Sequence, residues 1–504
     1  MNTTYKKIII VLIILLLVIL YLTLKIEKNN TLYTYDETID WSSYTEKTIE
    51  LTSSLDITEA GVYRLSGSID GKITINTNGN VKLVLNDVNI KNENGSAITV
   101  FSANLVVIET LDNTTNTLED GSSYENNIGT IYSNSNLVLE GNGTLIVNGN
   151  MEDAIVSKEN LKINSGSYII SSKDDAIRGK NSVYIKNGNF NITSADGIKS
   201  SSGYVQILDG NFKLNSVLDG IQAESKITIE NGVFNITTES SDSSSKGIKA
   251  NDIEIINGTF NLNTVDDSIH ANNSIYIKSG TFEISSNDDG IHADKLITIE
   301  DGNININKSY EGIEACEIII NGGDIKIEAS DDGINAASKT NSIATLTING
   351  GNIYVDAYGD GLDSNGYIYI NGGSLKVLGP TNDGNGALDY DKECIIKGGD
   401  LLAIGSSGMA QGISSTSSQY GILVNLSTNY NSSDIISLVN HNDQEIFSYT
   451  ATKKFSSVVY SSSSLLKDET YTIKINGEIV YTFTINSINT TVGKRMNTKP
   501  GFRR

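Results

Sequence analysis

Cysteine and positive charge are both scarce in this sequence. Its 504 residues contain two cysteines, Cys316 and Cys394, so the chain is not a disulfide scaffold, and we expect both to be free thiols. Acidic residues number 60 against 37 lysines and arginines, which leaves a formal net charge of −23. Such a chain repels phosphates, so we expect no nucleic acid partner. Cations, or an anionic partner bridged by cations, fit the charge better.

The amino-terminus lacks the marks of a cleaved leader. An apolar run from Ile8 to Leu24 follows Lys6 and Lys7, and neither a small-x-small cleavage site nor a lipobox cysteine comes after it. Its length is at the short end for a bilayer span. We predict a signal anchor, a transmembrane helix, at residues 1–25 and a linker at 26–55, with a cleaved signal peptide as the alternative. The two lysines would stay inside, so we expect a single-pass protein of the cell membrane with the bulk of the chain extracellular.

One short motif recurs along most of the chain. An acidic residue, a small residue and isoleucine or leucine return at intervals of 21 to 28 residues, as in Asp175–Ile177 and Asp289–Ile291, and we call this the DGI motif. Asn-Gly followed by an apolar residue keeps the same register, and the apolar residues between alternate with the period of a strand. Three short strands and three turns in about 22 residues predict an all-β parallel β-helix of about 12 or more coils over residues 56–415.

The repeat fades toward the carboxy-terminus. Alternating strands such as Tyr471 to Ile485 predict a small C-terminal antiparallel β cap over residues 416–488, because the open edge of the last coil needs a cover. Residues 489–504 are predicted to be a basic tail.

The acidic residue of the DGI motif predicts a stack of charge, which we call the acidic column. Successive coils lie about 4.8 Å apart, and carboxylates at that distance repel one another. Protonation or bound cations would relieve the repulsion. Several Ca²⁺ ions fit, because calcium takes six to eight oxygen ligands, although these side chains could instead cap turns through backbone amides. The predicted calcium ligands are Asp174, Asp175, Asp196, Asp219, Asp266, Asp267, Asp288, Asp289, Glu311, Asp331, Asp332 and Asp360.

A second stack, the polar strip, consists of the residues that follow the isoleucine of each motif: Arg178, Lys199, Gln222, Lys249, His270, His292, Glu314 and Asn335. A basic strip beside calcium suits an acidic sugar, and the candidate ligand-binding residues are Arg178, Lys199, Lys249, His270 and His292. The two histidines could also be metal ligands or a base, although a stacked polar pair on a sheet face explains them too. Lys246 stands in the acidic column itself, where a fixed cation would replace calcium.

These repeats resemble a known family. The motif DDGIHAD (Asp288 to Asp294), the Asn-Gly-Gly coils and the segment GVYRLSGSIDGKITINTNGNVKLVLNDVNIKNENGSAITV (Gly61 to Val100) are similar to bacterial cell-surface carbohydrate-binding proteins. The resemblance covers about residues 50–485. It implies a right-handed, pectate-lyase-like β-helix with calcium bound along it at the paired aspartates, and cellulose-like glucans or polygalacturonate as ligands. Lys246 and Glu311 depart from the family pattern.

Three functions remain open. The first is non-catalytic, calcium-dependent binding of polysaccharide at the cell surface by a monomer. The second is a polysaccharide lyase, in which Lys199 or Lys249 would be the base and Arg178 would assist. The third is a structural spacer or adhesin stiffened by calcium. Trp41 is the one tryptophan and lies outside the repeats, so a tryptophan platform for crystalline cellulose is missing.

Overall fold

The structure, a computed structural model, describes residues 39–126, 128–240, 245–339 and 342–495. The chain divides into two units, Met1–Thr45 and Glu46–Arg504. In the first unit the described part contains a 3-10 helix, η1 (Trp41–Ser43). No helix among the described residues is long and apolar enough to span a membrane. The predicted signal anchor lies outside those residues and stays a prediction.

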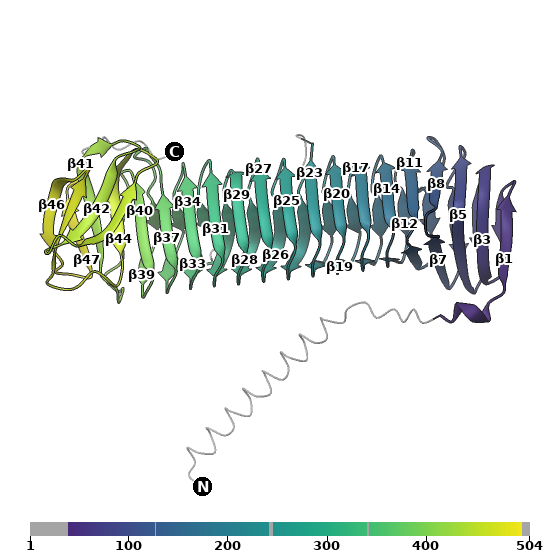
Figure 1. Cartoon of the computed structure of the whole chain (residues 1–504), viewed down its shortest axis with the longest axis horizontal. Helices are drawn as coiled ribbons and strands as arrows, with labels where there is room; N and C mark the ends of the chain where they lie inside the picture. The colour runs from purple at the N-terminus through teal and green to yellow at the C-terminus, as the bar shows by residue number, and fades with distance from the viewer. Residues whose placement is uncertain (1–38, 127, 241–244, 340–341, 496–504) are drawn as a thin grey trace, which may run out of the picture. The chain divides into compact units, whose positions relative to one another are not determined.

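The second unit is a right-handed parallel β-helix of about 16 turns, which confirms the predicted fold (Figure 1). Each coil crosses three parallel ladders, numbered here in the order in which the chain meets them after a DGI motif. Ladder 1 consists of β2 (Leu55–Ile57), β4 (Ile73–Asn76), β6 (Ile98–Ser102), β9 (Ile131–Ser133), β12 (Ile155–Ser157), β15 (Ile177–Gly179), β18 (Ile198–Ser200), β21 (Ile221–Ala223), β32 (Ile334–Ala336), β35 (Leu362–Ser364) and β38 (Leu388–Tyr390). Four strands run without a break from ladder 1 into ladder 2: β24 (Ile248–Ile255), β26 (Ile269–Ile277), β28 (Ile291–Ile299) and β30 (Ile313–Ile320).

Ladder 2 also contains β7 (Leu105–Thr110), β10 (Leu137–Gly141), β13 (Asn160–Ile163), β16 (Ser182–Ile185), β19 (Tyr204–Ile207), β22 (Lys226–Ile229), β33 (Thr345–Ile348), β36 (Tyr367–Ile370) and β39 (Glu393–Ile396). At the amino-terminal end, β1 (Glu46–Leu51) lies in ladder 2, and two long strands, β3 (Gly61–Asp70) and β5 (Asn80–Asn92), join ladders 2 and 3. Ladder 3 continues with β8 (Thr115–Asp120), β11 (Thr144–Gly149), β14 (Ser167–Ser172), β17 (Asn189–Ser194), β20 (Asn211–Ser216), β23 (Val233–Thr238), β25 (Thr259–Thr264), β27 (Thr281–Ser286), β29 (Asn303–Ser309), β31 (Asp324–Ala329), β34 (Asn352–Ala357), β37 (Ser374–Leu378) and β40 (Asp400–Gly405).

Identical residues stack in the core. The motif isoleucines pair in register from coil to coil, as Ile177 does with Ile198, and are fully buried. In ladder 3 the residue two positions after the turn glycine forms an aromatic stack from Tyr168 to Phe282, with ring centroids 4.6 to 5.1 Å apart. The glycine before each ring needs a positive φ, +140° at Gly210, which side chains rarely adopt. The repeat therefore fixes the coil register on which the functional surface depends.

The predicted boundaries need two corrections. Strand β1 already pairs with β3 in the stack, so the β-helix begins at Glu46, within the predicted linker. The basic tail was predicted from residue 489, but β47 (Asn489–Gly493) pairs with β41 (Gly421–Tyr430), because its alternating residues can extend a sheet edge.

Antiparallel strands follow the last coil. β44 (Phe455–Ser461) pairs antiparallel with β40 and β41, and a separate four-stranded sheet contains β42 (Ile435–Asn440), β43 (Glu445–Thr450), β45 (Thr470–Ile475) and β46 (Glu478–Thr484). That these strands act as a cap stays a prediction.

Candidate functional site: the acidic column and the polar strip

The acidic column lies at the corner where each coil enters ladder 1. Each of its residues stands two positions before a buried isoleucine or leucine of that ladder, so the in-register pairing of the ladder sets the spacing of the charges. Their side chains are largely enclosed, with Asp153 and Asp175 1% exposed. The structure therefore brings the predicted carboxylates together along one edge of the β-helix.

One oxygen of most column carboxylates accepts a backbone N–H of the next coil. Asp153 Oδ1 accepts the backbone N–H of Asp175 at 3.0 Å, and Asp267 Oδ1 accepts that of Asp289 at 3.1 Å. The same bond recurs from Asp196, Asp219, Asp289, Asp332 and Asp360. The sequence alternative was a cap on the backbone of the same turn, whereas in these seven aspartates Oδ1 binds an amide of the next coil and the second oxygen remains for a cation.

At the amino-terminal end of the column, basic residues of the polar strip neutralise that second oxygen. Arg178 pairs with Asp153 and lies 3.3 Å from Asp175 Oδ2. Lys199 Nζ lies 2.7 Å from Asp196 Oδ2 and 3.2 Å from Asp175 Oδ1. We call the four carboxylates with such partners the paired section: Asp153, Asp175, Asp196 and Asp219, the last with Lys249 Nζ at 3.4 Å.

Burial and ion pairing oppose each other in the paired section. Burial raises the pKa of Asp153 to about 6 and that of Asp175 to about 7, although Arg178 and Lys199 act against the rise. Burial lowers the pKa of Lys199, but the hydrogen bond to Asp196 and the charge of Asp175 outweigh it, so its pKa is raised. Lys199 therefore holds its proton firmly.

In the middle of the column, Lys246 supplies the fixed cation that the sequence predicted. Its Nζ lies 2.7 Å from Asp266 Oδ1 and 3.1 Å from Asp267 Oδ2. Burial would raise the pKa of Asp267, but the hydrogen bond from His270 and the charge of Lys246 hold it well below its usual range. Burial and the nearby Asp289 raise the pKa of Asp288 to about 6. These residues border a hollow of about 420 Å³ that also contains both strip histidines.

The carboxy-terminal end of the column differs in its surroundings. Within the described residues, no lysine, arginine or histidine pairs with the four carboxylates that we call the open section, which are Glu311, Asp332 and Asp360 of the column and Asp363 of the polar strip. Burial, reinforced by neighbouring carboxylates, raises the pKa of Glu311 and of Asp363 to about 8. The same causes raise the pKa of Asp332 to about 6 and that of Asp360 to about 7.

The polar strip changes sign along its length. Its members pair in register as predicted, from Arg178 with Lys199 to His292 with Glu314. The register then continues through Asn335 to Asp363 and Asp389. Sequence reasoning missed these last two residues, although Asp363 follows the leucine of a regular repeat and Asp389 that of a weaker one. It also left Asp153 out of the calcium ligands.

The outer aspartates of the doubled motifs lie farther from the core. Asp174, Asp266 and Asp331 are half-buried and Asp288 is exposed. Oxygens of Asp153, Asp174 and Asp175 lie within 4.8 Å of one another, as do those of Asp266, Asp267 and Asp288. Both groups have the oxygen-only chemistry that calcium prefers.

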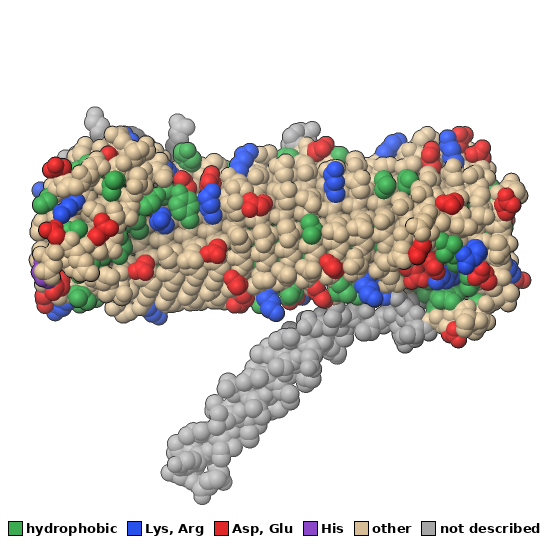
Figure 2. All heavy atoms as spheres, viewed as in Figure 1, with side chains coloured by type: hydrophobic (Ala, Val, Ile, Leu, Met, Phe, Trp, Pro, Cys, Tyr) green, Lys and Arg blue, Asp and Glu red, His purple; other side chains and the backbone are tan. Residues whose placement is uncertain are grey.

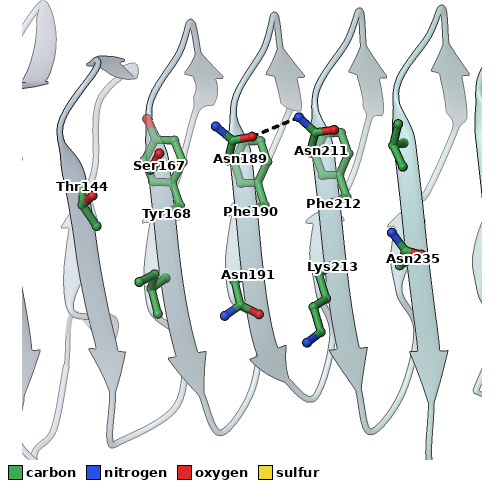
Figure 3. A pocket seen from close by; sticks show the side chains of 12 residues that line it. Thr144, Ser167, Tyr168, Asn189, Phe190, Asn191, Asn211, Phe212, Lys213 and Asn235 are labelled. Atoms are coloured by element: carbon green, nitrogen blue, oxygen red, sulfur yellow. Dashed lines mark hydrogen bonds between the residues drawn. The ribbon is translucent and has the colours of Figure 1, made fainter.

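A second hollow, which the sequence did not point to, lies on ladder 3. It has about 360 Å³ and is lined by the aromatic stack around Phe190 together with uncharged polar residues such as Asn189 and Asn211 (Figure 3). Asn211 donates a hydrogen bond to Asn189 Oδ1 at 3.0 Å. Uncharged polar side chains and backbone also dominate the face of the β-helix drawn in Figure 2. This surface offers hydrogen bonds but little charge.

Comparison with known proteins relates this chain to a family, to one relative and to one solved structure. A family model described as carbohydrate-binding domain-containing protein matches residues 52–290, 274–344 and 315–450. A carbohydrate-binding domain-containing protein of Acetivibrio thermocellus is 32% identical over 146 residues, which are 27% of this chain and 49% of that protein. The match thus spans about half the length of this relative. Among solved structures, a polysaccharide lyase-like protein from C. thermocellum, a gadolinium derivative, is 23% identical, with a TM-score of 0.35, over 51% of this chain and 99% of that one.

Proposed function

Because this chain belongs to the family of carbohydrate-binding domain-containing proteins, we propose that it binds an acidic polysaccharide without catalysis and that calcium on the acidic column mediates the binding. The family supports a polysaccharide partner. The observation that carries the calcium requirement is the open section, where Glu311, Asp332, Asp360 and Asp363 face one another and no basic side chain of the described residues pairs with them.

Calcium suits the open section for two reasons. The carboxylates are held close together by the coil register, and calcium accepts many oxygens in a flexible geometry. An ion there would remove the mutual repulsion and keep open positions for the carboxylates of a uronate chain. Binding at the cell surface, through a membrane anchor outside the described residues, is the remaining part of the proposal.

The lyase alternative is weaker, because its base is unsuitable. Abstraction of a proton next to a carboxylate requires an unprotonated amine. Lys199 is bound to two carboxylates, Asp175 and Asp196, and its pKa is raised. Lys249 lies 3.4 Å from Asp219 Oδ2 and Arg178 pairs with Asp153. All three basic residues thus serve as counter-ions of the paired section.

A retention assay tests the proposal. The metal-free protein is passed over immobilised polygalacturonate and over a neutral glucan, with calcium or with chelator. We expect retention on polygalacturonate with calcium only, and loss of retention in the variant Asp332→Asn/Asp360→Asn/Asp363→Asn.

The matched control is Asp209→Asn/Asp301→Asn/Asp324→Asn, which removes the same charge from turns and strands away from the column. Equal losses in both variants, or retention that survives the chelator, would refute a role for the open section. Ultraviolet absorbance that rises with time on polygalacturonate would show an unsaturated product and would support the lyase alternative.

A further inference from the structure

Two imidazole rings lie next to each other on the polar strip. His270 on β26 and His292 on β28 pair in register, with ring centroids 5.0 Å apart. The chain has three histidines, and the third, His441, lies among the carboxy-terminal antiparallel strands beside Glu469. His292 is 8% exposed, so its environment is set by the neighbouring coils.

The Nδ1 atom of His292 faces several carboxylates at once. It lies 2.9 Å from Asp289 Oδ2, 3.2 Å from Glu314 Oε2 and 3.7 Å from Asp267 Oδ2. A single N–H can donate to only one of these oxygens. Ligand atoms bound to one ion at about 2.1 Å lie roughly 3 Å apart, which is the spacing seen around this nitrogen.

The outer nitrogens of both rings can keep the proton that a metal displaces. His270 Nε2 lies 3.3 Å from Asn272 Oδ1, and Nδ1 lies 2.6 Å from Asp267 Oδ2. Both oxygens accept, so a metal at Nδ1 would replace the proton that points to Asp267, while Nε2 keeps its proton. His292 Nε2 lies 3.8 Å from Asp294 Oδ1. Lys339 Nζ lies 3.4 Å from the same nitrogen. Because the Lys339 side chain is 66% exposed, it would move into solvent when an ion binds.

We propose that Asp289, His292 and Glu314 bind one divalent transition-metal ion, with His270 and Asp267 as further ligands from the preceding coil. Imidazole nitrogen favours ions of the zinc and cobalt class, whereas calcium takes oxygen ligands. Asp267 is the weaker ligand, because Lys246 already lies 3.1 Å from its Oδ2. The hollow of about 420 Å³ gives an ion access to all five residues.

This site is separate from the proposed calcium at the open section, and no polysaccharide is needed to test it. Protein without a histidine tag is stripped of metal and titrated with Zn²⁺ by calorimetry in excess calcium. We expect one Zn²⁺ per chain, binding at least tenfold weaker in His292→Gln and a smaller loss in His270→Gln. His441→Gln and Asp363→Asn are the matched controls and should bind as the unsubstituted chain does.

A second measurement does not depend on variants that could misfold. Cu²⁺ bound to the His441→Gln protein should show nitrogen hyperfine coupling in its electron paramagnetic resonance spectrum. No Zn²⁺ binding, or binding that calcium displaces, would overturn the proposal and leave His292 as an imidazolium counter-ion like Lys246. Unchanged Zn²⁺ affinity in His270→Gln/His292→Gln would do the same.

Discussion

The two ends of the acidic column lie at the same corner of the coil, but their stacked carboxylates have different neighbours. In the paired section, Arg178 and Lys199 lie against the carboxylates. In the open section, the same strip position holds Asn335 or Asp363, and the charges add instead of cancelling. The residue after the isoleucine therefore decides whether a coil supplies its own cation or needs one from solution.

The largest expected effect comes from removing a cation of the paired section. Arg178→Gln leaves Asp153 and Asp175 buried without their shared partner, and breaking a buried pair on one side costs about 3 kcal/mol. Urea unfolding should show this loss. Lys226→Gln, which breaks the more exposed pair with Glu254, should cost less than about 1 kcal/mol. Similar costs for both would mean that the paired section does not depend on its cations.

Calcium should have the next largest effect, and it should act on the open section. Excess calcium over chelator is expected to raise the melting temperature by about 5 °C or more, because it binds the folded state only. Asp332→Asn/Asp360→Asn/Asp363→Asn should lose this rise, whereas Asp209→Asn/Asp301→Asn/Asp324→Asn should keep it. A melt that calcium leaves unchanged would contradict the proposed ion.

The metal-free protein should become less stable as pH rises. Glu311 and Asp363, with pKa values of about 8, and Asp360, at about 7, hold protons in the folded state that the unfolded chain releases above about pH 4. Stability is therefore greatest at low pH and is lost progressively between about pH 4 and pH 8. Melting temperatures from pH 5 to 8 should fall, and less steeply in the open-section triple variant.

That slope will not vanish, because Asp153 and Asp175 also have raised pKa values. A melting temperature that is constant or rises over this range would show that the carboxylates of the open section are ionised in the folded protein without loss of stability.

The smallest expected effect is a change in the free energy of unfolding whose sign differs between the two sections. In metal-free buffer at pH 8, Asp363→Asn should raise the free energy of unfolding by about 1 kcal/mol, because it removes one of several mutually repelling charges. Lys199→Gln in the paired section should lower it. Denaturant unfolding of both variants checks the contrast, and a destabilising Asp363→Asn would mean that this carboxylate has a partner in the fold.

The sequence predicted the β-helix, the coil register and most of the column, because the same motif recurs in nearly every coil. It did not predict how each carboxylate is satisfied. The doubling of Asp174–Asp175 and Asp288–Asp289 suggested equivalent calcium sites, yet the two pairs have different surroundings. Asp389 was missed because its motif, Gly386 to Leu388, is degenerate, and the role of Asp363 appears only when Asn335 is followed into the next coils.

The sequence by itself determined which residues share a column, since a repeat of about 22 residues with period-two alternation admits one stacking register. Only the tertiary structure decided which oxygen of Asp153 or Asp267 caps the backbone and which side chain approaches the other oxygen. It also brought His292 Nδ1 against carboxylates of three different coils. The reason is physical: periodicity sets position along a strand, whereas contacts between coils depend on the direction and length of each side chain.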